Sequence, residues 1–402
     1  MPTDPICKME VDETSEFGSL HNGQKYIFCS CECKKKFDEL DTSVIRLRRF
    51  LKHQHEDKAK RAISFGHLYR DIIKPGICTQ CGACIASCEV LRMEGGRPKL
   101  VGKCIACGVC YNQCPRTITT EVALIGKFRE ALTARNGPKG IGGQDGGVIS
   151  SLLLYALDEG LIDSAVVTAT NPDEPWRPIP IIAKNRDDLI RAAGSKYTHA
   201  LTMDALFSTI KLGARSVAFV GNSCNIDAVH KMQTSPQGLL HLFMRANILK
   251  LGLFCMDTFD YDGMKMFFKG QGIALDEIEK MVIKKGKFVV ETAAGERVFD
   301  LGDFDGIRSS SCKYCTDFAC EKTDISFGGV GSKDGYTTVL VRSGIGYEIF
   351  HEAVDSGYIE ADVLDSAGLE RVLNLAKAKK VQMYMFEKRK DKDKDKGTQL
   401  LS

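Results

Sequence analysis

Eight of the seventeen cysteines lie in two short runs that share one spacing, C-x2-C-x2-C-x3-C. The first run is Cys78, Cys81, Cys84 and Cys88, and the second is Cys104, Cys107, Cys110 and Cys114. Two runs of this kind hold two 4Fe-4S clusters, and the fourth cysteine of each run serves the other cluster. Zinc sites instead pair C-x2-C units across a longer loop. The spacing therefore predicts iron–sulfur clusters and one-electron transfer.

Crossed ligation divides these thiols into two sets. One predicted set is Cys78, Cys81, Cys84 and Cys114, and the other is Cys104, Cys107, Cys110 and Cys88. Pro115 follows the last cysteine, as in bacterial two-cluster ferredoxins. We expect a ferredoxin-like domain here.

Four more cysteines lie near the start of the chain, namely Cys7, Cys29, Cys31 and Cys33. Thiolates at this density favour Zn or Cu(I), and a unit of about 40 residues needs such a metal to supplement its small core. The segments DPICKMEV (4–11) and FCSCECKKKF (28–37) resemble the YHS/TRASH-type metal-binding module. The resemblance implies that Cys7, Cys29 and Cys33 are ligands and that Cys31 is an extra thiol. We interpret the unit as a structural zinc knuckle, with metal sensing or delivery as the alternative.

The last five cysteines are Cys224, Cys255, Cys312, Cys315 and Cys320. Cys224 follows a predicted strand-to-helix turn, and Cys255 ends a predicted strand. Because the carboxyl ends of strands in an α/β sheet open onto one crevice, these two thiols and the Cys312/Cys315 pair could close one four-thiolate site. Buried cysteines of an ordinary core explain the spacing equally well.

The region from about 75 to 375 resembles the family of beta subunits of coenzyme F420-reducing hydrogenase, which includes F420 dehydrogenases. The segments that carry the resemblance are GQDGGV (143–148), GSKY (194–197), VGNSCNI (220–226), GLFC (252–255), CKYCTDF (312–318) and TDIS (323–326). The family implies an FAD and a proximal 4Fe-4S cluster, with Cys224, Cys255, Cys312 and Cys315 at the cluster positions and Cys320 outside them. Asn222-Ser223 departs from the family, where Thr-Pro is common.

Two of these segments suit a flavin pyrophosphate. Glycines before a helix let main-chain N–H groups and the helix dipole face an anion, and Gly146-Gly147 precede a predicted helix. Asp145 is in place to cap that helix. The predicted cofactor-binding residues are Gln144, Asp145, Gly146, Gly147, Gly194, Ser195, Lys196, Tyr197 and Asn222.

The predicted fold is an α/β catalytic body preceded by a two-cluster ferredoxin-like domain and a small Cys-rich metal module. The expected boundaries are 1–42 for the metal module, 43–74 for a basic linker, 75–120 for the ferredoxin-like domain, 121–386 for the FAD- and F420-binding body and 387–402 for a disordered charged tail. Strands are expected at 164–169, 216–220, 249–254, 281–283, 288–290 and 336–341, and helices at 148–157, 203–212, from 225 and at 347–355. Asn22-Gly23 predicts a turn in the module. The basic stretch 45–67 is interpreted as a solvated linker helix, with a docking surface as the alternative.

The composition argues against nucleic-acid-binding, secreted and membrane-spanning proteins. A formal net charge of +3 over 402 residues does not indicate nucleic-acid binding. The start of the chain is charged and has no apolar run, and no stretch of about 20 apolar residues follows. Many cysteines without a secretory signal indicate metal ligands in a reducing compartment. We expect a cytoplasmic protein, or one held on the inner membrane face through a partner complex.

These parts suggest hydride transfer from reduced coenzyme F420 to FAD, then single electrons through three 4Fe-4S clusters to a partner, in either direction. The combination resembles the electron-input subunit of the membrane F420H2 dehydrogenase. Partners of the heterodisulfide reductase or hydrogenase type fit as well. The alternatives are a ferredoxin-dependent F420 reductase, a tetrapyrrole reductase, and a non-catalytic polyferredoxin-type relay. Catalytic residues remain unassigned.

Overall fold

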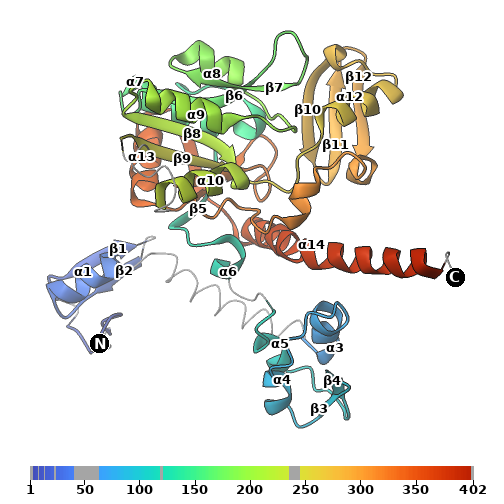
Figure 1. Ribbon diagram of the computed structural model, residues 1–402. Helices are drawn as coiled ribbons and strands as arrows, with labels where there is room; N and C mark the ends of the chain where they lie inside the picture. Colours follow the sequence, from blue (N-terminus) through green and yellow to red (C-terminus); the bar gives the residue numbers. More distant parts are fainter. Residues whose placement is uncertain are drawn as a thin grey trace. The chain divides into compact units, whose positions relative to one another are not determined.

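The computed structural model describes residues 3–39, 63–117, 121–234 and 245–399, except residues 8, 13, 22 and 23 (Figure 1). The chain divides into two compact units, Met1–Asp57 and Lys58–Ser402. The expected Asn22-Gly23 turn and most of the basic stretch 45–67 lie outside the described residues.

The first unit is a hairpin followed by a helix. Strand β1 (Gly18–His21) pairs antiparallel with β2 (Gln24–Ile27), and α1 (Cys31–Glu39) follows. Phe28 and Phe37 are almost fully buried, and their ring centroids lie 4.9 Å apart. Two aromatic rings are a small core, which fits the expectation that thiols and a metal must supplement it.

The second unit begins with the ferredoxin-like segment. It contains α3 (Phe65–Leu68), the short π-helix η1 (Tyr69–Ile73), α4 (Ala83–Ala86), the hairpin β3 (Leu91–Glu94) and β4 (Arg97–Leu100), and α5 (Val109–Asn112). Leu68, Ile72 and Ile73 are buried in one cluster with Leu91. Part of the expected linker 43–74 therefore belongs to this segment, because these apolar side chains complete its core.

The body is built on one eight-stranded sheet in the order β15-β5-β14-β13-β9-β8-β6-β7. The strands are β5 (Glu130–Asn136), β6 (Ser164–Thr170), β7 (Pro178–Ala183), β8 (Ser216–Asn222), β9 (Asn247–Leu253), β13 (Ile325–Gly328), β14 (Thr337–Val341) and β15 (Ile359–Val363). The four central strands, β6, β8, β9 and β13, run parallel, and antiparallel strands extend both edges. The strands expected at 164–169, 216–220, 249–254 and 336–341 are confirmed.

Successive side chains of a strand point to opposite faces of a sheet, and this alternation supplies two cores. Ala165 and Val167 face one cluster, whereas Val166 faces the other. Helices α7 (Val148–Asp158), α8 (Arg186–Ala192) and α13 (Gly344–Asp355) cover the first face. Helices α9 (Thr202–Lys211) and α10 (Ser223–Thr234) cover the second. The result is a three-layer α/β/α sandwich.

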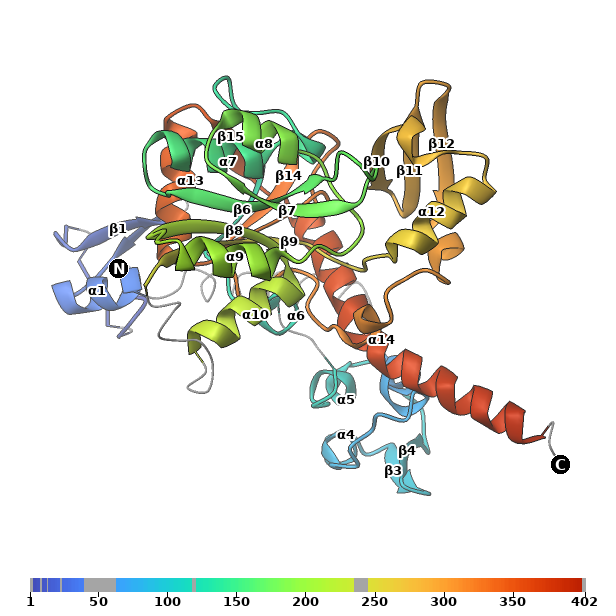
Figure 2. The ribbon, with the colours of Figure 1, turned by 45° about the horizontal axis from the view of Figure 1, so that its top comes forward.

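A second, smaller sheet was expected only as a hairpin. Strands β10 (Ile278–Lys284), β11 (Lys287–Thr292) and β12 (Gly295–Asp300) form an antiparallel meander, which α12 (Tyr261–Gly270) accompanies (Figure 2). Short 3-10 turns, η3 (Leu275–Glu277) and η4 (Leu301–Phe304), flank it. Phe268, Phe288 and Phe304 fill its own core. The hairpin expected at 281–290 is correct but incomplete.

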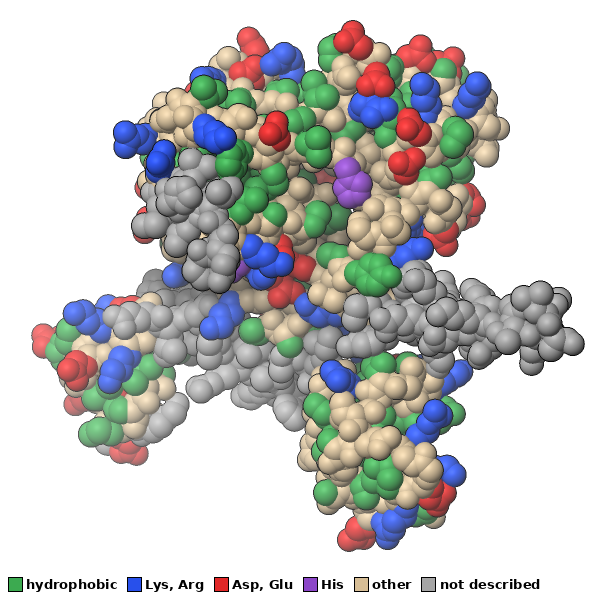
Figure 3. Space-filling view, viewed as in Figure 1, with side chains coloured by type: hydrophobic (Ala, Val, Ile, Leu, Met, Phe, Trp, Pro, Cys, Tyr) green, Lys and Arg blue, Asp and Glu red, His purple; other side chains and the backbone are tan. Residues whose placement is uncertain are grey.

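The chain ends in one long helix, α14 (Ser366–Gln399). The tail 387–402 was expected to be disordered, but the helix continues through most of it. Among the described helices, none combines the length and apolar composition needed to cross a bilayer. On the face in Figure 3, the Lys, Arg, Asp and Glu side chains of the body are interspersed rather than separated by sign.

A partly exposed contact between α13 and β5 gives a pH-dependent prediction. His351 of α13 lies 2.8 Å from the Glu130 carboxylate of β5, and this hydrogen bond raises the pKa of His351 above 6.5. The stabilisation is therefore full below about pH 6.5 and is lost as the pH rises through the folded-state pKa. We expect His351→Gln to be less stable than the wild type near pH 6, by under about 1 kcal/mol because the pair is partly exposed.

The difference in unfolding temperature between the two proteins should shrink from about pH 6 to about pH 8. Comparing the two proteins at each pH removes effects common to both. A difference that stays constant over this range would contradict the assignment.

Candidate functional sites

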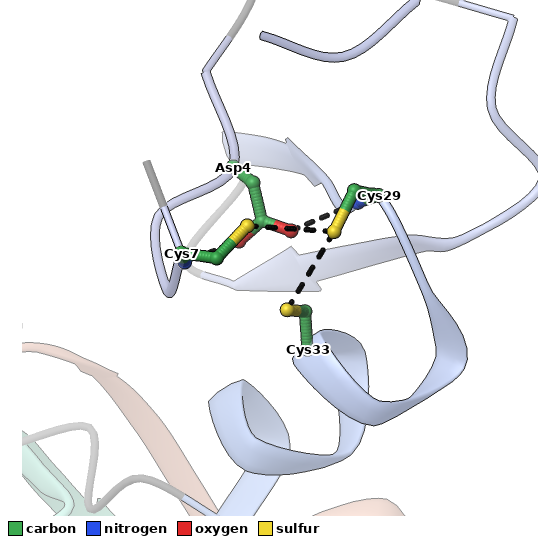
Figure 4. Close-up of side chains that lie close together, drawn as sticks. All are labelled: Asp4, Cys7, Cys29 and Cys33. Atoms are coloured by element: carbon green, nitrogen blue, oxygen red, sulfur yellow. Dashed lines mark hydrogen bonds between the residues drawn. The ribbon is translucent and has the colours of Figure 1, made fainter. Parts of the chain in front are cut away.

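The N-terminal module gathers three thiols and one carboxylate. One carboxylate oxygen of Asp4 and the sulfurs of Cys7, Cys29 and Cys33 lie within 4.8 Å of one another (Figure 4). The Cys29 sulfur is 3.4 Å from that of Cys7 and 3.7 Å from that of Cys33. Cys31 is exposed and lies outside the group. The three expected ligands are thus brought together, and three sulfur donors suit Zn or Cu(I).

Asp4 was not predicted, and its hydrogen bonds show what it does. Its carboxylate accepts the main-chain N–H of Ile6 (2.7 Å), Cys7 (3.2 Å) and Cys29 (2.8 Å). Burial alone would raise the pKa of Asp4, but these N–H groups outweigh it and hold the pKa far below its usual range. Asp4 therefore braces the two loops that carry Cys7 and Cys29. An Asp three residues before a cysteine was the only signal in the sequence.

The ferredoxin-like segment contains two thiol-lined cavities. One is lined by Cys78, Cys81, Cys84 and Cys114, together with Leu68 and Ile72. The other is lined by Cys88, Cys104, Cys107 and Cys110, together with Phe65 and Leu91. The structure thus groups the thiols as crossed ligation requires. Apolar walls around thiolates also suit clusters whose potential depends on solvent exclusion.

The two halves of this segment repeat one backbone conformation. Gln80 and Ala106 have φ of 57° and 55°, and Gly82 and Gly108 have φ of 78° and 75°. Left-handed residues turn main-chain N–H groups inward. The N–H of Ala106 lies 3.4 Å from the Cys104 sulfur, and the N–H of Ala83 lowers the pKa of Cys81. The contact at Cys81 favours thiolate over thiol.

A third thiol group lies at the carboxyl ends of β8 and β9. Cys224 is the second residue of α10, which follows β8 directly, and Cys255 lies two residues after β9. Cys312 lies in the 3-10 turn η5 (Ser310–Tyr314), and Cys315 ends that turn. Burial raises the pKa of Cys255, and the charges of the other three thiols add to the rise. All four residues implied by the family resemblance therefore share one environment.

Neighbouring groups support the third thiol group. The main-chain N–H of Thr258 lies 3.4 Å from the Cys312 sulfur, and its hydroxyl lies 3.4 Å from the same atom. That hydroxyl is also 2.8 Å from Nε2 of His199. Cys320, by contrast, is fully buried in the apolar cluster between β8 and α10. Its exclusion from the predicted ligands agrees with this packing.

The two loops expected to bind flavin meet through Gln144. Its side-chain Nε2 lies 3.3 Å from the hydroxyl of Tyr197, and its Oε1 lies 3.4 Å from the N–H of Ser195. The Tyr197 hydroxyl also accepts the N–H of Ile283 from β10 at 3.1 Å. Burial raises the pKa of Tyr197 to about 12, so its phenol stays neutral. One glutamine therefore joins two motifs that lie far apart in the sequence.

The remaining predicted flavin contacts have their own local roles. Gln144–Gly146 form the 3-10 turn η2, and Gly147, rather than Asp145, is the N-cap of α7. Asp145 cannot cap the helix because its carboxylate is directed to Gly329; a Cβ at Gly329 would lie 2.4 Å from it. Lys196 donates to the carbonyls of Ala192, Ala193 and Gly194 at the end of α8, and burial lowers its pKa to about 8. Asn222 ends β8, and its N–H donates to Asn225.

Family models match most of the chain. The model for the N-terminal part of the coenzyme F420 hydrogenase/dehydrogenase beta subunit matches residues 131–207, and the model for its C-terminal part matches 214–367. The beta subunit of the coenzyme F420 hydrogenase of Methanothermobacter thermautotrophicus is 34% identical over 64% of this chain and 94% of its own length. The chain belongs to the family of coenzyme F420 hydrogenase/dehydrogenase beta subunits. A 4Fe-4S dicluster domain at 70–115 and a YHS domain at 3–41 precede this F420 beta-subunit region.

Two other relatives and one solved structure are also similar to this chain. The F420-dependent sulfite reductase of Methanocaldococcus jannaschii is 37% identical over 69% of this chain, but the match spans only 46% of that enzyme. One component of the F(420)H(2) dehydrogenase of Methanosarcina mazei is 30% identical over 77% of this chain and 91% of its own length. A chain of the F420-reducing [NiFe] hydrogenase complex from Methanosarcina barkeri superposes with a TM-score of 0.62, at 32% identity over 66% of this chain and 93% of its own.

The bracing role of Asp4 is testable in the full-length protein. We expect Asp4→Ala to lose zinc to a chelator much faster than the wild type, because three main-chain N–H groups of the thiol-bearing loops lose their acceptor, each hydrogen bond contributing about 0.5–1.5 kcal/mol. Asp12→Ala is the matched control, since among the described residues the Asp12 carboxylate accepts from Thr14 in a local turn and from no thiol-bearing loop. Zinc per chain after dialysis is the measurement. Equal retention in Asp4→Ala and Asp12→Ala would contradict the role.

Proposed function

We propose that this protein is an oxidoreductase that takes hydride from reduced coenzyme F420 onto FAD and passes electrons singly through three 4Fe-4S clusters to a partner protein. The family membership supports F420 as the substrate, since its relatives are named as F420-dependent hydrogenase, dehydrogenase and sulfite reductase proteins. The matched dicluster domain supports the two outer clusters.

One observation carries the proposal: the loops expected to bind flavin and the third thiol group both lie at the carboxyl ends of the parallel strands. Cys224 and Cys255 follow the parallel strands β8 and β9. Strand β13 is parallel to them, and Asp145 lies against Gly329, just beyond the end of β13. The carboxyl ends of parallel strands are where α/β sheets bind ligands. This placement supports a hydride-accepting site and a cluster site at the same end of the sheet.

The residues at this end of the sheet fit the two cofactors that the family implies, a 4Fe-4S cluster and FAD. Four thiols, three of them partly buried and Cys224 exposed, provide the ligand set of a 4Fe-4S cluster. The α7 N-terminus, Gln144 and the neutral Tyr197 hydroxyl offer hydrogen-bond donors to an anionic or carbonyl-bearing cofactor. When bound, FAD supplies the conversion between hydride transfer and one-electron steps. A hydride carries two electrons and one proton, whereas a 4Fe-4S cluster takes one electron at a time, so a group that can do both is needed between them.

The ferredoxin-like segment then serves as the outlet toward a partner. The named relatives include subunits of a hydrogenase and of a dehydrogenase, so an electron-accepting or electron-donating complex is the proposed partner. The direction of flow depends on the potentials of that partner. Zinc in the N-terminal module is proposed to be structural.

Anaerobic titration with reduced coenzyme F420 tests the proposal. With the reconstituted full-length protein, we expect flavin absorbance to bleach first and cluster absorbance to follow. Iron–sulfur absorbance without bound FAD would leave only an electron relay. Bound FAD that reduced F420 fails to bleach would point to another substrate, such as a tetrapyrrole. Either result would overturn the proposal.

Crossed ligation makes a separate prediction. Cys88→Ala should abolish the cluster of Cys104, Cys107 and Cys110, although Cys88 belongs to the other run. Cys114→Ala should abolish the opposite cluster, because its sulfur lines the cavity of Cys78, Cys81 and Cys84. Electron paramagnetic resonance and iron content of the reduced variants are the measurements. If Cys88→Ala and Cys84→Ala lose the same signal, the ligation is not crossed.

A further inference from the structure

The long C-terminal helix places a buried cation beside the third thiol group. Lys379 of α14 is only 1% exposed. The C-terminal family model ends at residue 367, so most of α14 lies beyond the part that defines the family. Lysine is rarely buried to this degree without a partner. Its contacts are therefore informative.

The Lys379 ammonium is bound to the two loops that carry three of the four thiols. It donates to the main-chain carbonyl of Met256, next to Cys255, and to that of Cys312 at 3.1 Å. One turn later, Gln382 donates to the carbonyls of Cys312 and Cys315. Residues three apart lie on the same helix face. This face of α14 thus holds both thiol-bearing loops.

Lys379 is one of two cations in a small group of charged side chains. The nearest carboxylate is that of Asp257, whose Oδ1 lies 3.7 Å from the Lys379 ammonium. Its other oxygen pairs with Arg308 at 3.2 Å, and Asp257 is itself 9% exposed. Arg308 also pairs with Asp305 at 2.8 Å, so two carboxylates face the two cations. Lys379 is nevertheless the cation that donates directly to the loops of Cys255 and Cys312, and its own ion pair with Asp257 is the longest of the three. Such charges act strongly where water is excluded.

We propose that Lys379 is a positioning residue that holds the loops of Cys255 and Cys312 and stabilises the reduced state of the cluster bound there. The inference rests on the proposed third cluster. Reduction adds one negative charge to a cluster, and a nearby buried cation favours that state. The cation therefore raises the reduction potential of this cluster relative to a site without it.

Redox titration of the full-length protein, followed by electron paramagnetic resonance, tests the inference. Cys224→Ala first identifies the signal of the third cluster, because that signal alone should disappear. In Lys379→Met, we expect this cluster to bind an electron about tenfold more weakly, which is a shift of about −59 mV for a one-electron couple. Iron content checks that the cluster is retained.

Two controls separate charge from architecture. Lys380→Met removes the neighbouring cation, which pairs with Glu321 rather than with the thiol loops. Gln382→Leu removes the neutral hydrogen bonds to the same loops without changing charge. Both should leave the potential of the third cluster nearly unchanged. A shift in Gln382→Leu as large as in Lys379→Met would overturn the electrostatic role.

A second variant keeps the inference testable if Lys379→Met does not fold. Asp257→Asn preserves shape but removes the carboxylate that partly cancels Lys379, so the potential should shift upward. An unchanged potential in Lys379→Met, or a downward shift in Asp257→Asn, would overturn the inference. If Cys224→Ala removes no signal, the third cluster itself fails, and with it that part of the proposed function.

Discussion

The body depends on the close parallel pairing of β8 and β9. Their register sets Asn222 opposite Leu253 and Gly221 opposite Gly252, so the chains that leave both strands start from neighbouring points. A Cβ at Gly252 would lie 2.3 Å from the Cys320 sulfur, which no packing permits. The missing side chain lets the segment after Cys315 press onto the sheet. Without that approach, the Cys312 turn could not face Cys224 and Cys255.

The N-terminal module, the ferredoxin-like segment and the body position their thiols in different ways. In the N-terminal module, a carboxylate and three N–H bonds arrange the thiols around a very small core. In the ferredoxin-like segment, left-handed residues shape the loops. In the body, a large sheet fixes two thiols and α14 fixes the other loop. The dependence on local hydrogen bonds therefore decreases as the surrounding core grows.

Much of this was accessible from the sequence because the spacing of cysteines encodes local geometry. Strands β6, β8, β9 and β14 were also predicted, since buried strands have a strong apolar signature. Strands β5, β7, β12, β13 and β15 and the contact of Gln144 with Tyr197 were not predicted, because they depend on residues distant in the chain. Asp4 and Lys379 were missed for a related reason. A single charged residue has no periodic pattern, and only burial distinguishes it from a surface charge.

The crossed grouping of thiols makes the two halves of the ferredoxin-like segment depend on each other. Gln80 and Ala106 differ in type but share a backbone conformation, as expected of two copies of one ancestral half. Each copy contributes one sulfur to the cavity of the other. Neither copy can then be lost, inserted or recombined alone without opening both cavities. The ferredoxin-like segment therefore acts as one unit, in which each half completes the site of the other.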